Sequence, residues 1–268
     1  MTGTIAGLPD FWDDLRGRDH RLLALDYDGT LAPFRVERME ATPLPGVVGA
    51  LEHIAVRGDT RVAVVSGRPL EDLRVLLALP DGLGIAWVGS HGFEGQRADG
   101  ERWARKLSGA QVRGLEQARA VVESLGHGNK LEPKPSALAL HTRGLDPDVA
   151  RGLQKTVTSR WSPLCGEDGL HLHAFDGGVE LRVTTADKGQ ALRELWRAEP
   201  SETLVVYVGD DVTDEDAFAV AAEAGGVGIR VGGGDRPTRA RGTLRDCGAV
   251  LDMLRRWADE PRMAEERT

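Results

Sequence analysis

Short apolar runs alternate with amphipathic stretches near both ends of the chain. Residues 21–29 (RLLALDYDG) and 60–68 (TRVAVVSGR) each hold a continuous apolar run that predicts a buried strand. Between them, apolar residues recur at helical spacing over residues 44–58, at Leu44, Val47, Val48, Leu51 and Ile54. Gly58 then ends the predicted helix just before the second strand. This stretch therefore predicts a strand–helix–strand unit.

The same alternation continues further along the chain. Residues 69–79 repeat the helical pattern, and residues 84–92 (GIAWVGSHG) predict a third strand. Near the other end, residues 203–211 and 226–232 predict two more strands, separated by the helix at 214–224. Buried strands that alternate with helices are typical of a parallel sheet covered on both faces. The two ends of the chain are thus expected to build one α/β core with a Rossmann-like parallel sheet.

The middle of the chain has a different order of elements. A helical stretch at 108–126 is followed by a strand pattern at 136–144, a helix at 146–160 and a strand-like segment at 169–183. This helix–strand–helix–strand order predicts a small α+β cap domain inserted into the core. The expected division is core residues 1–105, cap residues 106–185 and core residues 186–268.

Composition narrows the classes of protein that remain. The 268 residues are 41% hydrophobic and 28% charged, as in ordinary globular proteins, and their formal net charge of −8 argues against nucleic-acid binding. No apolar stretch is long enough for a membrane span, and the N-terminus lacks a secretory leader pattern. Cys165 and Cys247 stand far apart, which suggests neither a disulfide framework nor a zinc site. We therefore expect a cytoplasmic, monomeric protein that binds neither nucleic acid nor membrane.

Two groups of acidic residues follow predicted strands. Asp26 and Asp28 come at the end of the first strand, and Asp210, Asp211 and Asp214 follow the strand at 203–211. In open parallel sheets, ligands bind beyond the carboxyl ends of the strands, so these acids are expected in one crevice. Carboxylates crowded together repel one another unless a cation binds among them, and Mg²⁺ prefers such oxygen ligands. Taken singly, the first group also fits an Asp–Gly turn and the second a solvated helix N-terminus.

Further residues complete a site suited to phosphoryl transfer. Ser66, Gly67 and Arg68 follow the second strand, and Lys188 opens the helical stretch KGQALRELWRA. Phosphoryl transfer needs an in-line nucleophile and neutralisation of the charge on the phosphoryl oxygens. The Ser66 hydroxyl, backbone N–H groups, Lys188 and Mg²⁺ are candidates for that neutralisation.

The segments DYDGT, SGR, ADKG and GDDVTDED occur in that order, and with them the chain resembles the haloacid dehalogenase superfamily. The resemblance implies that Asp26 is the nucleophile, that Asp28 is the general acid and base, and that Ser66 and Lys188 bind the phosphoryl group. It also implies a Mg²⁺ ion held by Asp26, the backbone carbonyl of Asp28, and Asp210. Supporting roles are expected for the remaining motif residues Thr30, Gly67, Arg68, Asp211 and Asp214.

The segments GSHGFE, LEPKPSALALHTR and GGVELRV, with the threonine of GDDVTDED, resemble the trehalose-6-phosphate phosphatases more narrowly. That resemblance implies a disaccharide phosphate as substrate and hydrolysis of trehalose 6-phosphate to trehalose and phosphate. It also implies sugar or phosphate contacts from residues of the cap, namely Glu132, Lys134, His141, Arg143 and Glu180.

The sequence departs from this family at two positions. Asp176 stands where the family usually has a lysine, and Val183 stands where it has a proline. An acidic residue in the cap suits an amine-bearing pseudo-disaccharide phosphate of secondary metabolism better than trehalose, so that substrate remains an alternative. A receiver-type signalling domain and a non-catalytic sugar-phosphate sensor are further alternatives, although the cap and the complete set of motif residues favour a phosphatase.

Overall fold

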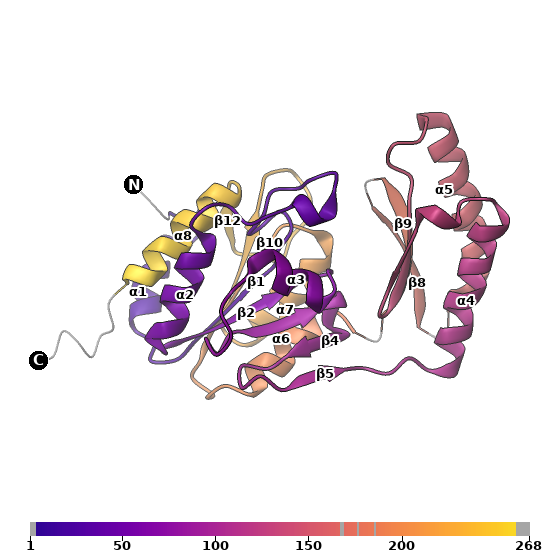
Figure 1. Ribbon diagram of the computed structural model, residues 1–268. Helices are drawn as coiled ribbons and strands as arrows, with labels where there is room; N and C mark the ends of the chain where they lie inside the picture. The colour runs from indigo at the N-terminus through magenta and orange to yellow at the C-terminus, as the bar shows by residue number, and fades with distance from the viewer. Residues whose placement is uncertain (1–3, 167–168, 176, 185, 261–268) are drawn as a thin grey trace, which may run out of the picture. The chain divides into compact units, whose positions relative to one another are not determined.

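The computed structural model describes residues 4–166, 169–175, 177–184 and 186–260, and the chain divides into two compact units (Figure 1). The first unit combines residues 1–103 with residues 187–268, and the second is residues 104–186. The second unit therefore interrupts the first in the sequence.

Within the described residues, the strands of the first unit belong to an eight-stranded sheet in the order β12-β11-β10-β1-β2-β3-β4-β5. Neighbouring strands from β12 to β3 are parallel, and β4 pairs antiparallel with β3. The strand bounds are β1 Arg21–Leu25, β2 Thr60–Val65, β3 Ala86–Gly89, β4 Glu94–Gln96, β5 Arg102–Ala104, β10 Leu204–Gly209, β11 Val227–Val231 and β12 Gly242–Leu244.

Helices cover both faces of this sheet because successive strand side chains point to opposite sides. Leu23 and Leu25 of β1 pack in one core with residues of α1, α2, α3 and α8. Leu22 and Ala24 pack in a second core with residues of α6 and α7. The helix bounds are α1 Phe11–Arg16, α2 Val47–Arg57, α3 Leu70–Leu77, α6 Lys188–Arg197, α7 Glu215–Glu223 and α8 Cys247–Asp259. The parallel α/β core predicted from the sequence is confirmed.

The second unit is an antiparallel sheet with helices on one face. Its described strands lie in the order β6-β7-β9-β8, with bounds β6 Leu131–Lys134, β7 Ala137–His141, β8 Leu170–Phe175 and β9 Gly178–Val183. Helices α4 (Gly109–Ser124) and α5 (Pro147–Trp161) contribute Ala118, Val122 and Trp161 to a core shared with Leu138 and Leu181 of the sheet. This is the inserted α+β layer that the sequence predicts.

The predicted element order of this second unit was wrong in two places. The segment 169–183, expected as one strand, forms the hairpin of β8 and β9, with Gly177 at a φ of +88° between them. Pro133 also lies in β6, an edge strand that was not predicted. Proline is tolerated at a sheet edge because its missing N–H is not needed there. Periodicity alone does not reveal either feature.

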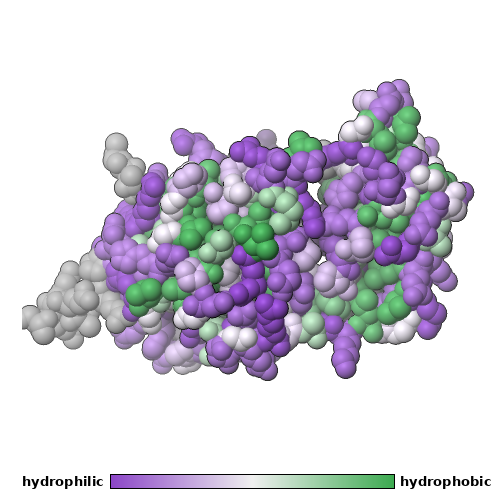
Figure 2. Space-filling view, in the orientation of Figure 1, coloured by the Kyte–Doolittle hydropathy of each residue, from purple (hydrophilic) through white to green (hydrophobic). Residues whose placement is uncertain are grey.

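The visible surface is mostly hydrophilic, with scattered hydrophobic patches (Figure 2). In the first unit, the loop after β1 exposes Phe34 and Val36, which are 68% and 75% exposed. Among the described residues, no helix is both long and apolar enough to cross a membrane.

Candidate active site

Three strands of the core deliver polar residues to the same edge of the sheet. Asp26, Ser66 and Asp210 each follow directly on β1, β2 and β10. The Asp26 N–H donates to the Val208 carbonyl at 2.8 Å, and the Ser66 N–H donates to the Val88 carbonyl at 2.9 Å. These bonds continue the parallel ladders one residue beyond the strands. The side chains are therefore fixed by the sheet itself rather than by a loose loop.

Lys188 lies at the centre of the buried charges. It is the first residue of α6 and only 2% exposed, and its Nζ lies 2.9 Å from Asp26 Oδ1 and 2.7 Å from Asp214 Oδ1. Burial by itself lowers the pKa of Lys188, but the carboxylates of Asp214 and Asp26 outweigh it and raise that pKa above its usual value. The ammonium group therefore stays charged and bridges the two acids.

Asp214 is held entirely by protein donors. It is fully buried, and besides Lys188 it accepts from the Tyr207 hydroxyl at 2.7 Å and from the Asp211 N–H at 2.8 Å. The side chain of Asp211 accepts from the Val212 N–H at 2.7 Å, and it also accepts from the Asp214 N–H, which completes a capping box at the start of the short helix Val212–Asp214. With both oxygens engaged, Asp214 positions Lys188.

Asp26 and Asp210 lie close together beside Asp214, and Lys188 is the one cation that pairs with this group among the described residues. Burial raises the pKa of Asp26 well above its usual value and raises that of Asp210 to about 7, and the neighbouring Asp214 adds to both shifts. The Oδ1 atom of Asp210 is buried and has no hydrogen-bond partner among the described residues. One carboxylate oxygen from each of Asp26, Asp210 and Asp214 lies within 4.8 Å of the other two. A buried orphan oxygen among crowded carboxylates fits a hard divalent cation.

Gly29 allows this close approach. Its φ is +72°, and a Cβ at this position would lie 2.2 Å from Asp210 Oδ2. No other residue type fits against the carboxylate in that conformation. The Asp–Gly pair is thus a turn, as the simpler interpretation of the sequence had it, and the turn brings the first acidic group against the second.

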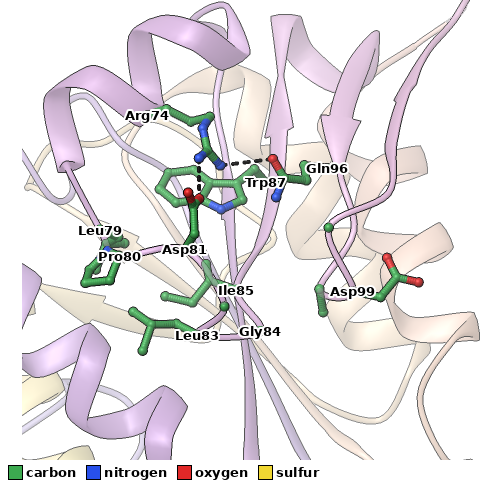
Figure 3. Close-up of a pocket in the computed structure, with 13 residues that line it drawn as sticks. Arg74, Leu79, Pro80, Asp81, Leu83, Gly84, Ile85, Trp87, Gln96 and Asp99 are labelled. Carbon is green, nitrogen blue, oxygen red and sulfur yellow. Dashed lines mark hydrogen bonds and ion pairs between the residues drawn. The ribbon is translucent and has the colours of Figure 1, made fainter.

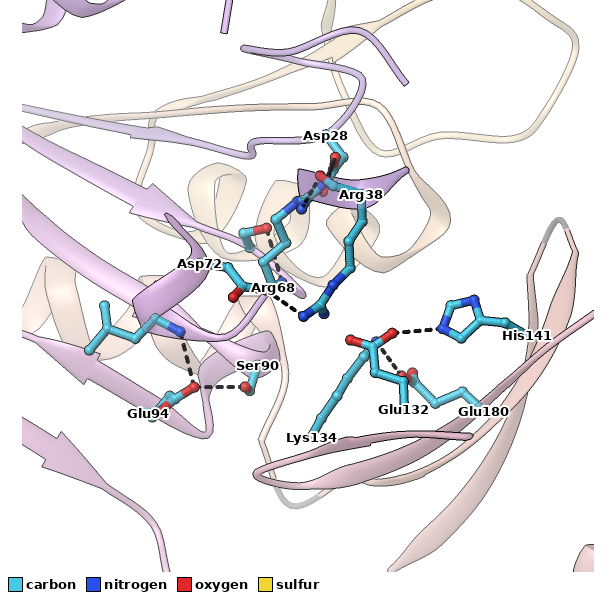
Figure 4. Close-up of polar contacts among 12 residues, drawn as sticks. Asp28, Arg38, Arg68, Asp72, Ser90, Glu94, Glu132, Lys134, His141 and Glu180 are labelled. Carbon is cyan, nitrogen blue, oxygen red and sulfur yellow. Dashed lines mark hydrogen bonds and ion pairs between the residues drawn. The ribbon is translucent and has the colours of Figure 1, made fainter. Parts of the chain in front are cut away.

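Asp28 is paired with Arg68. The guanidinium donates from Nε and Nη2 to the two carboxylate oxygens at 2.6 and 2.7 Å, a bidentate pair (Figure 4). Arg68 Nη1 donates to the Arg38 carbonyl at 2.7 Å, and the Arg38 side chain pairs with Asp72 at 3.1 Å. Arg68 therefore ties the loop that contains Arg38 to the acid that follows β1.

Three further residues predicted for the site, Ser66, Thr30 and Gly67, also lie in the loops that follow β1 and β2. Ser66 is 1% exposed and its Oγ accepts from the Arg68 N–H at 3.2 Å. Thr30 is fully buried, and its hydroxyl has no hydrogen-bond partner within the described part of the chain. Gly67 lies against the ring of His91, because a Cβ at Gly67 would be 2.5 Å from His91 Nε2.

Sequence reasoning missed Tyr207 and Arg38. Tyr207 lies inside the apolar strand β10, so its sequence position indicates a core side chain. In the structure its hydroxyl donates a hydrogen bond to Asp214. A buried tyrosine needs a hydrogen-bond partner, and that requirement is the signal available in the sequence. Arg38 acts through its backbone carbonyl, which no sequence pattern indicates.

In the second unit, the predicted sugar-binding residues share the sheet face opposite its helices. The register aligns Glu132, Ala139 and Glu180 in one row, and directly paired residues of neighbouring strands point to the same side. Lys134 Nζ lies 2.7 Å from Glu180 Oε1, and His141 Nε2 lies 2.6 Å from Glu132 Oε2 (Figure 4).

Two predicted positions lie beyond this row. Arg143 is exposed after the end of β7, and its side chain packs against Gly177, where a Cβ would lie 2.4 Å from Arg143 Cγ. Asp176, which departs from the lysine of the resembled family, lies outside the described residues.

A separate pocket of about 260 Å³ lies at the amino end of β3, lined by the loop from Leu79 to Ile85 (Figure 3). There Arg74 pairs with Asp81 and Gln96 and lies over the ring of Trp87. The candidate catalytic residues follow the carboxyl ends of the strands, so this pocket is not part of their site.

Solved structures with the same fold define the class of protein. The chain is similar to a phosphatase of the haloalkanoate (HAD) enzyme superfamily from Bacteroides thetaiotaomicron, with a TM-score of 0.55 and 16% identity over 89% of this chain and 95% of that one. It is also similar to the C-terminal domain of a Candida albicans trehalose-6-phosphate phosphatase, with a TM-score of 0.81 and 20% identity over 97% of this chain and 99% of that one. The fold is therefore that of the haloacid dehalogenase superfamily.

The sequence comparisons define the family within this class. Residues 24–246 match the trehalose-phosphatase family model. The chain is 34% identical over 246 residues to a trehalose-phosphate phosphatase of Mycobacterium marinum. The alignment covers 88% of this chain and 60% of that protein. The chain belongs to the trehalose-phosphatase family, and it spans about 60% of the length of this curated relative.

Proposed function

We propose that the protein is a Mg²⁺-dependent phosphatase that hydrolyses trehalose 6-phosphate to trehalose and phosphate, a step of trehalose biosynthesis. The observation that carries this proposal is the position of Lys188, which joins the carboxylate of Asp26 to that of Asp214 while Asp210 keeps a buried oxygen without a partner. Phosphoryl transfer to aspartate requires a nucleophilic carboxylate beside a fixed positive charge and acidic ligands for a divalent cation.

In the first half of the reaction, an oxygen of Asp26 attacks phosphorus as the bond from phosphorus to the sugar oxygen breaks. Asp28 gives its proton to that leaving oxygen, and the products are trehalose and an aspartyl-phosphate. In the second half, water attacks phosphorus while Asp28 takes its proton, and the bond from phosphorus to Asp26 breaks. Phosphate leaves, and both acids return to their starting states.

The Asp28–Arg68 ion pair must open before Asp28 can transfer a proton. Arg68 occupies both carboxylate oxygens of Asp28, at 2.6 and 2.7 Å. Asp28 exchanges a proton with the substrate only after at least one of these bonds opens. An incoming phosphate competes for the guanidinium, since Arg binds phosphate in the same bidentate way. Substrate binding itself therefore frees the carboxylate of Asp28, which takes up a proton before it protonates the leaving oxygen.

Mg²⁺ would be held by Asp26, Asp210 and the backbone carbonyl of Asp28. When bound, it supplies positive charge that stabilises the phosphoryl oxygens in the transition state. The Lys188 ammonium group and the Ser66 hydroxyl would bind the same phosphoryl oxygens. Thr30, Gly67, Arg68, Asp211 and Asp214 keep these groups in place.

The disaccharide is proposed to bind on the sheet face of the second unit that lies opposite its helices, through Glu132, Lys134, His141, Arg143 and Glu180. Support comes from the paired charges of that face, at 2.7 Å for Lys134 with Glu180 and 2.6 Å for His141 with Glu132. Such fixed, charged hydrogen-bonding groups recognise hydroxyl groups well and reject analogues that lack them. Cytoplasmic location and a monomeric state are part of the same proposal.

Asp176 favours a second candidate substrate, an amine-linked pseudo-disaccharide phosphate, because an acidic residue complements an amine. The test is Mg²⁺-dependent release of phosphate from trehalose 6-phosphate, amine-linked pseudo-disaccharide phosphates and glucose 6-phosphate. A kcat/KM highest for trehalose 6-phosphate supports the first proposal, and one highest for the pseudo-disaccharide supports the second. Equal rates on all three contradict both substrates, and no release from any favours a non-catalytic sensor.

A further inference from the structure

The segment Gly89–Glu94, with the sequence GSHGFE, has no role in the chemistry above. It follows β3, and its residues Ser90, His91 and Gly92 all have positive φ, at 50°, 56° and 99°. We call these three residues the SHG turn. A left-handed conformation is unfavourable for a residue with a side chain. Such strain persists only where the surroundings hold the backbone, and it clusters at functional sites.

On one side, the SHG turn is bonded to the loop Ser66–Arg68. The Ser90 N–H donates to the Arg68 carbonyl at 2.8 Å, and the His91 N–H donates to the Ser66 carbonyl at 2.9 Å. The His91 ring lies against Gly67 between these two bonds, so close that only glycine fits there. The turn therefore holds both ends of the loop, and the ring holds its middle.

On the other side, the SHG turn contacts the start of α6. A Cβ at Gly92 would lie 2.9 Å from the Asp187 carbonyl oxygen and 3.4 Å from Ala191 Cβ. Asp187 caps α6 through a 2.7 Å bond from the Gln190 N–H, and Lys188 is the first residue of that helix. One turn thus touches the elements that carry Ser66 and Lys188.

Glu94 connects the SHG turn to the start of α3. Its Oε1 accepts from the Ser90 hydroxyl at 2.9 Å and from the Leu70 N–H, at the start of α3, at 3.1 Å (Figure 4). Gly89 is also confined, because a Cβ there would lie 2.6 Å from the Leu70 nitrogen. The contacts of Glu94 and Gly89 therefore hold the backbone of the SHG turn in its left-handed conformation.

We propose that the SHG turn is a positioning element that sets the spacing between the Ser66–Arg68 loop and Lys188, and that His91 is its positioning residue. The inference rests on the proposed phosphatase function. It assigns His91 to the phosphoryl end of the substrate and not to the sugar. Two groups that bind the same phosphoryl oxygens from different elements need a fixed separation, since a misplacement of about 1 Å can cost 10²-fold in rate.

The test compares His91→Gly with Ala78→Gly. Ala78 has a φ of 47° at the end of α3, so glycine relieves left-handed strain at both positions, but only His91→Gly removes a ring from Gly67. We measure kcat/KM on p-nitrophenyl phosphate and trehalose 6-phosphate, inhibition by inorganic phosphate, and Tm. We expect His91→Gly to lower kcat/KM about 10- to 100-fold on both substrates and to weaken phosphate inhibition, with Tm within a few degrees of the wild type. Ala78→Gly should match the wild type in activity.

Wild-type kinetics in His91→Gly would overturn the proposal, as would a loss confined to trehalose 6-phosphate. If His91→Gly does not fold, His91→Asn replaces it, because asparagine tolerates the left-handed region. If the wild type releases no phosphate at all, the proposed function fails. Binding of inorganic phosphate in the presence of Mg²⁺ then decides the inference by itself: weaker binding by the His91 variant supports it, and equal binding refutes it.

Discussion

The stability of the metal-free protein should depend on pH because Asp210 is buried among other acids. Burial raises the pKa of Asp210 from 3.8 to about 7, with a further contribution from Asp214. Asp26, which is 4% exposed, also has a raised pKa. In the unfolded chain both carboxyl groups titrate near pH 4. Between pH 4 and pH 7 the folded state therefore binds more protons than the unfolded state.

The sign follows from this difference in bound protons. A raised carboxyl pKa favours the folded state at low pH, so the free energy of unfolding falls as pH rises from about 4 and levels off above about 7 for Asp210. At about 1.4 kcal/mol per pKa unit, a shift of roughly three units gives a loss of up to about 4 kcal/mol from Asp210. Mg²⁺ removes this loss, because the cation takes the place of the protons.

The assay is urea unfolding at pH 5 and pH 7.5, in EDTA and in saturating Mg²⁺. In EDTA the wild type should be less stable at pH 7.5, and Mg²⁺ should restore stability mainly at that pH. Asp210→Asn should show a smaller pH dependence and a smaller Mg²⁺ effect, because a carboxamide does not titrate. Asp148→Asn, at a side chain that is 88% exposed, serves as the matched control and should behave like the wild type. A metal-free wild type that is equally stable or more stable at pH 7.5 would refute the reasoning.

Substitutions at four positions test the site directly. Asp26→Asn should abolish turnover without unfolding the protein, because a carboxamide cannot form the acyl-phosphate; residual turnover above that of a no-enzyme blank would contradict its role. Lys188→Met should lower kcat by about 10²–10³-fold and the free energy of unfolding by about 3–5 kcal/mol, since it leaves buried carboxylates unpaired. The exposed Lys155→Met should change neither quantity, and an active, fully stable Lys188→Met would be incompatible with the bridging role. Glu132→Gln or Glu180→Gln should lower kcat/KM on trehalose 6-phosphate about tenfold or more while sparing p-nitrophenyl phosphate, and equal losses on both substrates would argue against a sugar contact.

The core was predictable because its hydrophobic pattern has one interpretation. Strands buried on both faces read as continuous apolar runs, such as RLLAL of β1, and only a parallel sheet between helices buries them so. The position of Asp26 and Asp210 followed from the same pattern, since the carboxyl ends of parallel strands meet at one edge. The observed alignment of Leu25 with Val208 brings the ends of β1 and β10 together.

Contacts between side chains of different elements were not predictable. Arg68 and Asp28 are 40 residues apart, and Tyr207 and Asp214 belong to different elements, so no period or spacing connects either pair. The hairpin of β8 and β9 was missed for another reason. Both strands alternate between polar and apolar positions, so the period joins them into one segment, although the Asp-Gly-Gly sequence between Phe175 and Val179 is a turn signal.

The charge balance of the site explains how a protein with a net charge of −8 accepts an anionic substrate. Three clustered carboxylates, those of Asp26, Asp210 and Asp214, lie beside one ammonium group, that of Lys188, which pairs with Asp26 and Asp214. Burial and the neighbouring Asp214 raise the pKa of Asp210 to about 7, so a proton offsets part of this negative charge in the metal-free state. A divalent cation in place of that proton makes the local charge less negative, and Arg68 adds a further positive group nearby once it leaves Asp28. Attraction for phosphate is therefore short-range and depends on Mg²⁺, so added salt should affect substrate capture less than removal of the metal does.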